Sequence, residues 1–161
     1  LGQAGLAIQT KRTPLDQLAS TIVAKFRPRA QQSHLTLESQ IEPNVWAMTD
    51  PLRLEQVLSN VLNNAFTYLQ SGAAVCVQLT RSKGDAVISV SDTGRGISPE
   101  TLKRIFEPFF QGHDERATHR GVGLGLSISR QIMQALGGSI DAESRPGVGS
   151  TFYIRLPALS D

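Results

Sequence analysis

The sequence predicts an α/β fold: a two-layer sandwich in which one mixed β-sheet is covered on one face by three helices. Helical and strand periodicities are interspersed along the chain, which favours an α/β class over an all-helical or all-strand one. The expected strands fall in neighbouring hairpins rather than in strict βαβ repeats, which favours a mixed sheet over a parallel one. The 161 residues, 40% hydrophobic and 19% charged, are typical of one globular domain.

Composition excludes several classes of protein. No apolar run approaches the roughly 20 residues that cross a bilayer, and there is no signal-like N-terminus. A start at Leu1 suggests a fragment excised from a longer chain. The net charge of +2 comes without a dense Lys/Arg block, so we expect no nucleic-acid partner. The single cysteine, Cys76, is expected to be a small buried hydrophobe, and this scarcity of cysteine fits a reducing, cytoplasmic location.

The N-terminal third is expected to hold one helix and two strands. Residues 1–12 show weak periodicity and are expected to be a linker or the tail of a missing upstream region, with the domain covering 13–161. Thr13-Pro14 predicts a helix start, with a capping hydroxyl and proline at the first helical position. Apolar residues at helical spacing follow: Leu15, Leu18, Ile22 and Phe26. Pro28 is expected to end or kink this helix, before strands at 35–41 and 45–48.

The middle of the chain predicts a second helix and a hairpin. Asp50-Pro51 repeats the pattern of cap and proline, and the apolar periodicity continues to Ala65. Residues 75–79 and 86–90 are rich in β-branched side chains, and the turn residues 82–85 between them predict a hairpin.

The C-terminal part predicts two further helices and two strands. A loop at 92–98 precedes a short helix near 99–105, whereas residues 111–121 are polar and have no periodic apolar signal. Leu126 to Leu136 predict another helix, which Gly137-Gly138 should end. Strands are expected at 139–142 and 150–156, around the turn Pro146-Gly147.

Asn60 and Asn64 form the first candidate site. They are four residues apart and should project from the same face of the second helix. Three asparagines within five residues lower helix propensity, and an amide oxygen is a suitable neutral ligand for Mg²⁺. A solvated helix face or a hydrogen bond between elements would explain the pattern equally well.

The second candidate, residues 92–97, directly follows a strand. The carboxylate of Asp92 could accept a hydrogen bond from an exocyclic amine, and Gly94 and Gly96 would let the backbone pass close to a flat ring. An ordinary Asp-Gly turn is the alternative.

Two glycine-rich blocks complete the pattern. Residues 121–126 alternate glycine with apolar residues before a helix, so their free N–H groups could hold phosphate; a flexible hinge is the alternative. The block is neither a Walker loop nor a dinucleotide fingerprint. Residues 147–152 are explained adequately by a tight hairpin.

Taken in order, these blocks resemble the catalytic and ATP-binding domain of bacterial sensor histidine kinases, in the superfamily that includes gyrase and heat-shock chaperone ATPases. Residues 60–65 look like the asparagine box, 92–96 like the first glycine box, and 105–110 like the phenylalanine box. Residues 121–126 and 147–152 look like the remaining glycine boxes. The resemblance covers about residues 13–157 and implies the Bergerat ATP-binding fold.

The resemblance also implies roles for single residues. Asn64 would coordinate Mg²⁺, Asn60 would support the phosphates, and Asp92 would bind the adenine amino group. Residues 111–121 would form a lid over ATP. The other residues implied to contact the nucleotide are Tyr68, Gly94, Gly96, Ile97, Gly121, Gly123, Leu124, Gly125, Leu126 and Thr151.

The chain departs from the family pattern at two points. The family often has a lysine three residues after the magnesium asparagine, where this chain has Thr67. The missing phosphate contact could move to one of four basic residues: Lys103, Arg104, Arg116 or Arg120. The phosphoacceptor block of histidine, acid and proline is also absent, and none of the three histidines fits it: His34, His113 and His119.

The function that the resemblance implies is binding of Mg²⁺ and ATP, followed by transfer of the γ-phosphoryl group to a histidine on a separate helical dimerisation domain. A response regulator would then receive the group. The fragment itself is expected to be monomeric, and its parent could be anchored in the inner membrane. The alternatives are a degenerate nucleotide-binding docking module, or a related ATPase or serine kinase. Asn60 argues against a hydrolase, because an amide cannot act as a base toward water.

Overall fold

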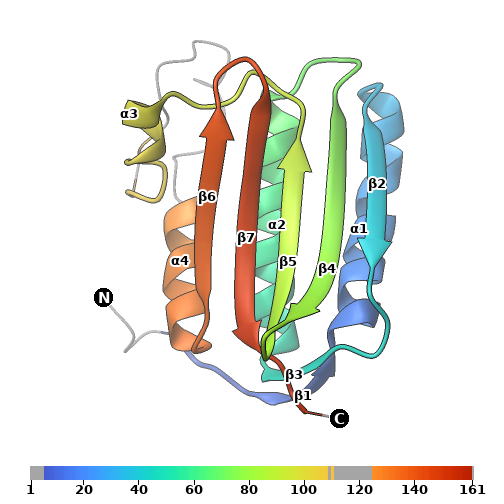
Figure 1. Ribbon diagram of the computed structural model, residues 1–161, viewed down its shortest axis with the longest axis vertical. Coiled ribbons are helices and arrows are strands. Elements are labelled where there is room, and N and C mark those ends of the chain that lie inside the picture. Colours follow the sequence, from blue (N-terminus) through green and yellow to red (C-terminus); the bar gives the residue numbers. More distant parts are fainter. Residues whose placement is uncertain (1–5, 109, 111–124, 161) are drawn as a thin grey trace.

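A computed structural model describes residues 6–108, 110 and 125–160, and the predictions for Phe109 and for 111–124 lie outside these ranges. Five strands form one mixed sheet in the order β2-β4-β5-β7-β6, and α1, α2 and α4 lie behind one face of it (Figure 1). This arrangement confirms the predicted fold class. The elements are β1 (Lys11–Pro14), α1 (Leu15–Gln32), β2 (Thr36–Ile41), β3 (Trp46–Thr49), α2 (Pro51–Tyr68), β4 (Ala74–Ser82), β5 (Asp85–Asp92), α3 (Pro99–Leu102), α4 (Gly125–Ala135), β6 (Ser139–Arg145) and β7 (Gly149–Pro157).

The sheet is built mainly from antiparallel neighbours. Among the strands that the structure describes, β2 and β4 run parallel, while β4–β5, β5–β7 and β6–β7 are antiparallel. The predicted hairpin between β4 and β5 is confirmed, and both of its turn residues have positive φ, 54° at Lys83 and 85° at Gly84. Positive φ at both central residues matches the right-handed twist of the two strands.

The core lies between the sheet and the helices. Alternate side chains of β4 face the helices, and Val75, Val77 and Leu79 are at most 1% exposed. Cys76 points the other way, and the expectation that it would be buried is wrong: it is half-buried on the helix-free face, level with Glu38 and Ser91. Burial and the nearby Glu38 raise the pKa of the Cys76 thiol, so it stays protonated at neutral pH.

The start of α1 differs from the prediction. Thr13 does not cap the helix; it lies in β1, which pairs with β3 in a separate two-stranded sheet. Its hydroxyl donates to the carbonyl oxygens of Lys11 and Thr49 at 2.8 and 3.3 Å. Pro14 is the N-cap, and it makes no side-chain capping bond. Thr13 is only 2% exposed, so strand pairing has displaced the capping role that the local sequence suggested.

Pro28 does not end α1, which continues to Gln32. Pro28 is exposed, and Ala30 beyond it is 3% exposed and belongs to the core cluster. Packing of the last turn therefore outweighs the hydrogen bond that proline removes from the helix.

The predicted start of α2 and end of α4 are confirmed, whereas the short helix expected near 99–105 spans only Pro99–Leu102. The Asp50 carboxylate caps α2 by accepting from the N–H groups of Leu52 and Arg53. The chain turns after α4 at Gly137, whose φ is 81°. In the described part of the chain, no helix is both long and apolar enough to cross a membrane.

Candidate nucleotide-binding site

The residues that the sequence singled out gather mainly at one end of the sheet. The C-terminal ends of α2 and β5 and the beginnings of β4 and β7 meet there, at the top of Figure 1, and the N-terminus of α4 lies below this end, where Gly125 contacts Asn60. Asn60, Asn64 and Tyr68 come from α2, and Asp92 from the end of β5.

Asn60 joins α2 to α4. Its side-chain nitrogen donates to the carbonyl oxygen of Gly125 at 3.2 Å and to Oγ of Ser129 at 3.1 Å. Both amide hydrogens are therefore used, so Oδ1 is the atom that remains to accept a hydrogen bond or bind a cation. Asn64, one turn later, is half-buried, and its side chain makes no hydrogen bond to any described residue. The two asparagines thus differ. Asn60 links two helices through hydrogen bonds, whereas the side chain of Asn64 has no hydrogen-bond partner among the described residues.

Asp92 presents a carboxylate at the end of β5. Its Oδ1 accepts the N–H of Gly94 at 2.9 Å, which holds the loop close to the strand end. Burial raises the pKa of Asp92 above its ordinary value, and hydrogen bonds from the backbone of Gly94 and Ser150 partly oppose that rise. A carboxylate held in this way is a strong acceptor for an amine that enters the site.

The loop after Asp92 is fastened to the β6–β7 hairpin. The N–H of Gly147 donates to Arg95 O at 2.6 Å, and the N–H of Ile97 donates to Oγ of Ser144 at 2.7 Å. Gly96 has a φ of 75°, and a Cβ at this position would lie within 3.0 Å of the backbone of Arg145. The close packing of this loop against the β6–β7 hairpin therefore requires glycine at position 96.

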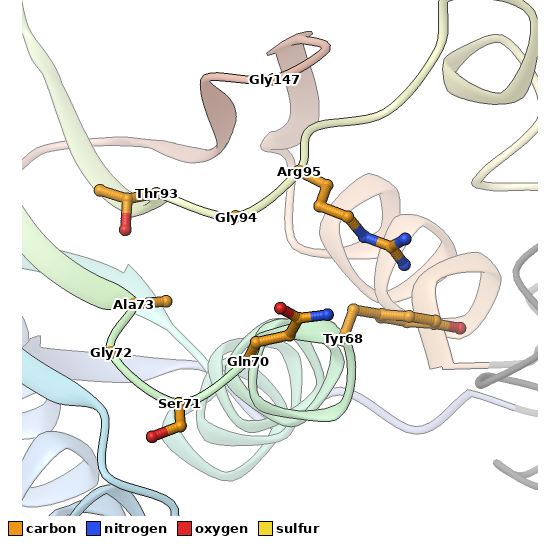
Figure 2. Close-up of a pocket in the computed structure, with 9 residues that line it drawn as sticks. All are labelled: Tyr68, Gln70, Ser71, Gly72, Ala73, Thr93, Gly94, Arg95 and Gly147. Atoms are coloured by element: carbon orange, nitrogen blue, oxygen red, sulfur yellow. The ribbon is translucent and has the colours of Figure 1, made fainter.

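A pocket of about 350 Å³ opens beside this loop (Figure 2). Figure 2 shows the side chains of Tyr68 and Arg95 on one side of it, and Ala73 and Thr93 on the other. The full lining is Tyr68, Gln70, Ser71, Gly72, Ala73, Thr93, Gly94, Arg95 and Gly147. Sequence reasoning missed the segment after α2, because four short polar or small residues carry no motif. Arg95 was also not predicted, because in the block 92–97 only Asp92, Ile97 and the two glycines were expected to contact a ligand.

The structure does not bring Thr151 to the site. Side chains alternate along β7, and Phe152 and Ile154 face the helices. Thr151 faces the opposite side of the sheet, where its hydroxyl lies 3.0 Å from that of Ser91. Ser150 is the neighbour on the helix side, in register with Asp92.

The glycine-rich block is described only in part. Gly121, Gly123 and Leu124 lie outside the described residues, whereas Gly125 is exposed at the start of α4, and Leu126 and Ile97 are half-buried. Two candidates for the missing phosphate contact, Arg116 and Arg120, also lie outside.

Arg104 and the phenylalanine box lie beyond α3. Nε of Arg104 lies 3.1 Å from Oε1 of Glu107, and its guanidinium carbon lies 4.7 Å from the ring centroid of Phe110. The charge of Arg104 is therefore already paired with a neighbouring carboxylate. Lys103, beside it, is exposed. Phe106 packs edge-on against Phe152 with ring centroids 6.4 Å apart, which fastens the segment to the sheet.

The amide oxygens of Asn60 and Asn64 and the carboxylate of Asp92 fit a magnesium–nucleotide complex. No cluster of three or more histidine, cysteine, aspartate or glutamate side chains that could hold a metal occurs among the described residues. A divalent ion here would have amide oxygens from α2 and would depend on oxygens from its ligand. Mg²⁺ binds in this manner, through few protein atoms together with phosphate oxygens and water.

Comparison with known proteins agrees with the geometry. Residues 49–160 match the family described as "Histidine kinase-, DNA gyrase B-, and HSP90-like ATPase", and the chain belongs to that family. Within it, the chain is of the histidine kinase type, with the fold of the histidine kinase catalytic domain.

Three similar proteins illustrate the match. The sensor histidine kinase RcsC of Escherichia coli (strain K12) is 37% identical over 157 residues, which cover 94% of this chain and 16% of RcsC. Full-length ShkA in complex with AMPPNP has a TM-score of 0.83 and 26% identity, covering 97% of this chain and 32% of ShkA. The complex of histidine kinase ThkA with the response regulator TrrA has a TM-score of 0.79 and 23% identity, covering 94% and 42%. The chain thus spans a minor part of each of these proteins.

Proposed function

We propose that the chain binds ATP with Mg²⁺ and donates the γ-phosphoryl group to a histidine on a separate helical dimerisation domain. The observation that carries the proposal is the placement of a half-buried carboxylate, Asp92 at the end of β5, and of two half-buried amides, Asn60 and Asn64, on the helix α2 that packs against that strand. A bound adenine nucleotide has an amine for the former and phosphate with metal for the latter.

The proposal assigns one role to each group. Asp92 accepts a hydrogen bond from the adenine amine, and Tyr68 lies against the base. Asn64 binds the cation, which neutralises phosphate charge when it is bound. Asn60 holds α4 in place through its nitrogen, so that Oδ1 is presented toward the phosphates. The domain is proposed to cover 13–161.

A kinase is favoured over a hydrolase by the chemistry of Asn60. Hydrolysis of ATP needs a base that takes a proton from water, and an amide does not take up protons near neutral pH. Phosphoryl transfer to a neutral imidazole needs mainly positioning and neutralisation of charge. Asn60 adds no base at this position.

The proposed partners follow from the same chemistry. The phosphoacceptor histidine comes from a helical domain of the parent kinase, and a response regulator then receives the group. The fold match to ThkA, which has been solved with a response regulator, supports the second step. We propose that the chain alone is a monomer.

Calorimetric titration with AMPPNP and Mg²⁺ tests the proposal on the native chain, Asp92→Ala and Asn64→Ala. Asp92→Ala should bind AMPPNP about 10- to 100-fold more weakly, because it loses a hydrogen bond to a charged group. Asn64→Ala should remove the dependence on Mg²⁺. A folded native chain that binds no nucleotide would instead favour the degenerate docking module.

A further inference from the structure

The polar strip of α2 has no charge where the proposed phosphates would lie. Thr67 is four residues after Asn63 and three after Asn64, so its side chain is a neighbour of each of them on the helix surface. The Thr67 hydroxyl donates to the carbonyl oxygen of Asn63 at 2.8 Å, which turns it back into its own helix. Thr67 therefore brings neither charge nor a free donor to this strip.

Arg29 brings a cation from the neighbouring helix to the side of this strip that faces α1. Its Nη1 donates to Oδ1 of Asn63, across the contact between α1 and α2. The guanidinium lies 5.3 Å from the ring centroid of Phe66 and 6.0 Å from that of Phe26. Contacts with two rings and one amide restrict a side chain that would otherwise be flexible, so the charge is held beside the turn that carries Asn64.

The charge of Arg29 is not neutralised by the described part of the chain. Arg29 is half-buried, and no carboxylate among the described residues pairs with it. A guanidinium has five N–H donors, and the bond to Asn63 uses one. Arg27, in contrast, donates to Leu37 O at 2.7 Å and is directed toward β2. Arg29 is thus a pre-positioned cation with donors to spare, a suitable arrangement for binding an oxyanion.

We propose that Arg29 binds the terminal phosphates of the nucleotide and supplies the positive charge that Thr67 lacks. This inference rests on the proposed function, because it needs a nucleotide over α2. Binding would use the guanidinium already held at Asn63, with little additional ordering of the side chain.

Calorimetry on the whole chain with AMPPNP and adenosine tests the inference. Arg29→Gln should weaken AMPPNP binding by about tenfold or more, as expected for loss of a charged hydrogen bond, and leave adenosine binding unchanged. Arg27→Gln is the matched control on the same helix and should bind AMPPNP within about twofold of the native chain. Adding Thr67→Lys to Arg29→Gln should restore much of the lost affinity, and a purely structural role of Arg29 would not be rescued in this way.

Other results would overturn the inference. AMPPNP binding by Arg29→Gln at native affinity would show that Arg29 makes no phosphate contact, while leaving the proposed function intact. Equal loss of AMPPNP and adenosine binding would show that Arg29 acts only through packing. A folded native chain that binds neither compound would overturn the proposed function itself and the inference with it.

Discussion

Asp92 shows a conflict between binding and stability within one residue. The side chain is half-buried at the end of β5, and this partial burial raises its pKa because the charged form loses solvation. The folded state therefore holds the proton more tightly than the unfolded state, whose pKa is near 3.8. The contribution that this pKa difference makes to the stability of the fold is fully present below that pH. It is lost as pH rises through the higher pKa of the folded state.

Asp92→Asn should consequently make the chain more stable at pH 7 while weakening nucleotide binding. The asparagine oxygen can still accept the N–H of Gly94, and no charge is then buried. Thermal unfolding of both proteins between pH 3 and 8 measures the effect, and the difference in Tm should shrink toward the acid end. A variant that is less stable at pH 7 would show that the ionised carboxylate stabilises the loop.

Gly96 tests whether the loop must lie against the hairpin. Gly96→Ala places a methyl group against the backbone of Arg145 and also meets the cost of a positive φ, about 1 kcal/mol. Gly72→Ala is the matched control, because its φ is 95° but no atom lies within 4 Å of the new Cβ. Urea unfolding should show Gly96→Ala to be less stable than the control by roughly 1 kcal/mol or more. Equal losses would mean that the loop shifts freely.

At the scale of elements, Asp50 links the start of α2 to the segment that precedes β1. Its Oδ1 caps the helix, while Oδ2 accepts the N–H of Gln9 at 2.9 Å. Asp50 is 7% exposed, and its removal would leave the partly buried N–H groups of Gln9, Leu52 and Arg53 without this partner. Asp50→Ala should therefore lower the free energy of unfolding by about 2 kcal/mol, measured in urea. Ser98→Ala, which removes the exposed cap of the short α3, should have a smaller effect.

The two asparagines of α2 should separate structural from binding roles. Asn60→Ala removes two hydrogen bonds to α4, which should cost about 1–2 kcal/mol of stability. Asn64→Ala removes no bond to any described residue and should change stability by less than about 0.5 kcal/mol. Chemical denaturation without nucleotide distinguishes the two, and equal losses would contradict the division.

The elements also show which signals could be read from sequence. Asp50-Pro51 predicted the start of α2 correctly, because capping depends on atoms within one turn. Thr13-Pro14 has the same local chemistry but failed, because pairing of β1 with β3 occupies the Thr13 hydroxyl. That competition depends on residues more than thirty positions away, which a local pattern does not contain.

At the scale of the whole molecule, the layers were predictable and the details of the site were not. The order of periodic segments and hairpins fixed a mixed sheet with helices on one face, since each apolar stripe must be buried. Asp92 and the α2 asparagines were predicted as site residues because motifs mark them. Arg29, the proposed phosphate contact, carries no motif; it lies beside Asn63 only because α1 packs against α2, and nothing in the sequence around it indicates that contact.

Ligand binding should stabilise the chain as one cooperative unit, although the site occupies only one end. At about 100 times its Kd, a ligand specific for the folded state adds about 2.7 kcal/mol, which raises Tm by roughly 5–10 °C for a domain of this size. The single tryptophan, Trp46, lies in β3 at the opposite end of the sheet, beneath the guanidinium of Arg12 (Figure 1). Its fluorescence therefore reports unfolding far from the nucleotide. AMPPNP with Mg²⁺ should shift the fluorescence transition as far as the circular dichroism of the helices. A shift confined to the helices would show that the β1–β3 end unfolds independently of the site.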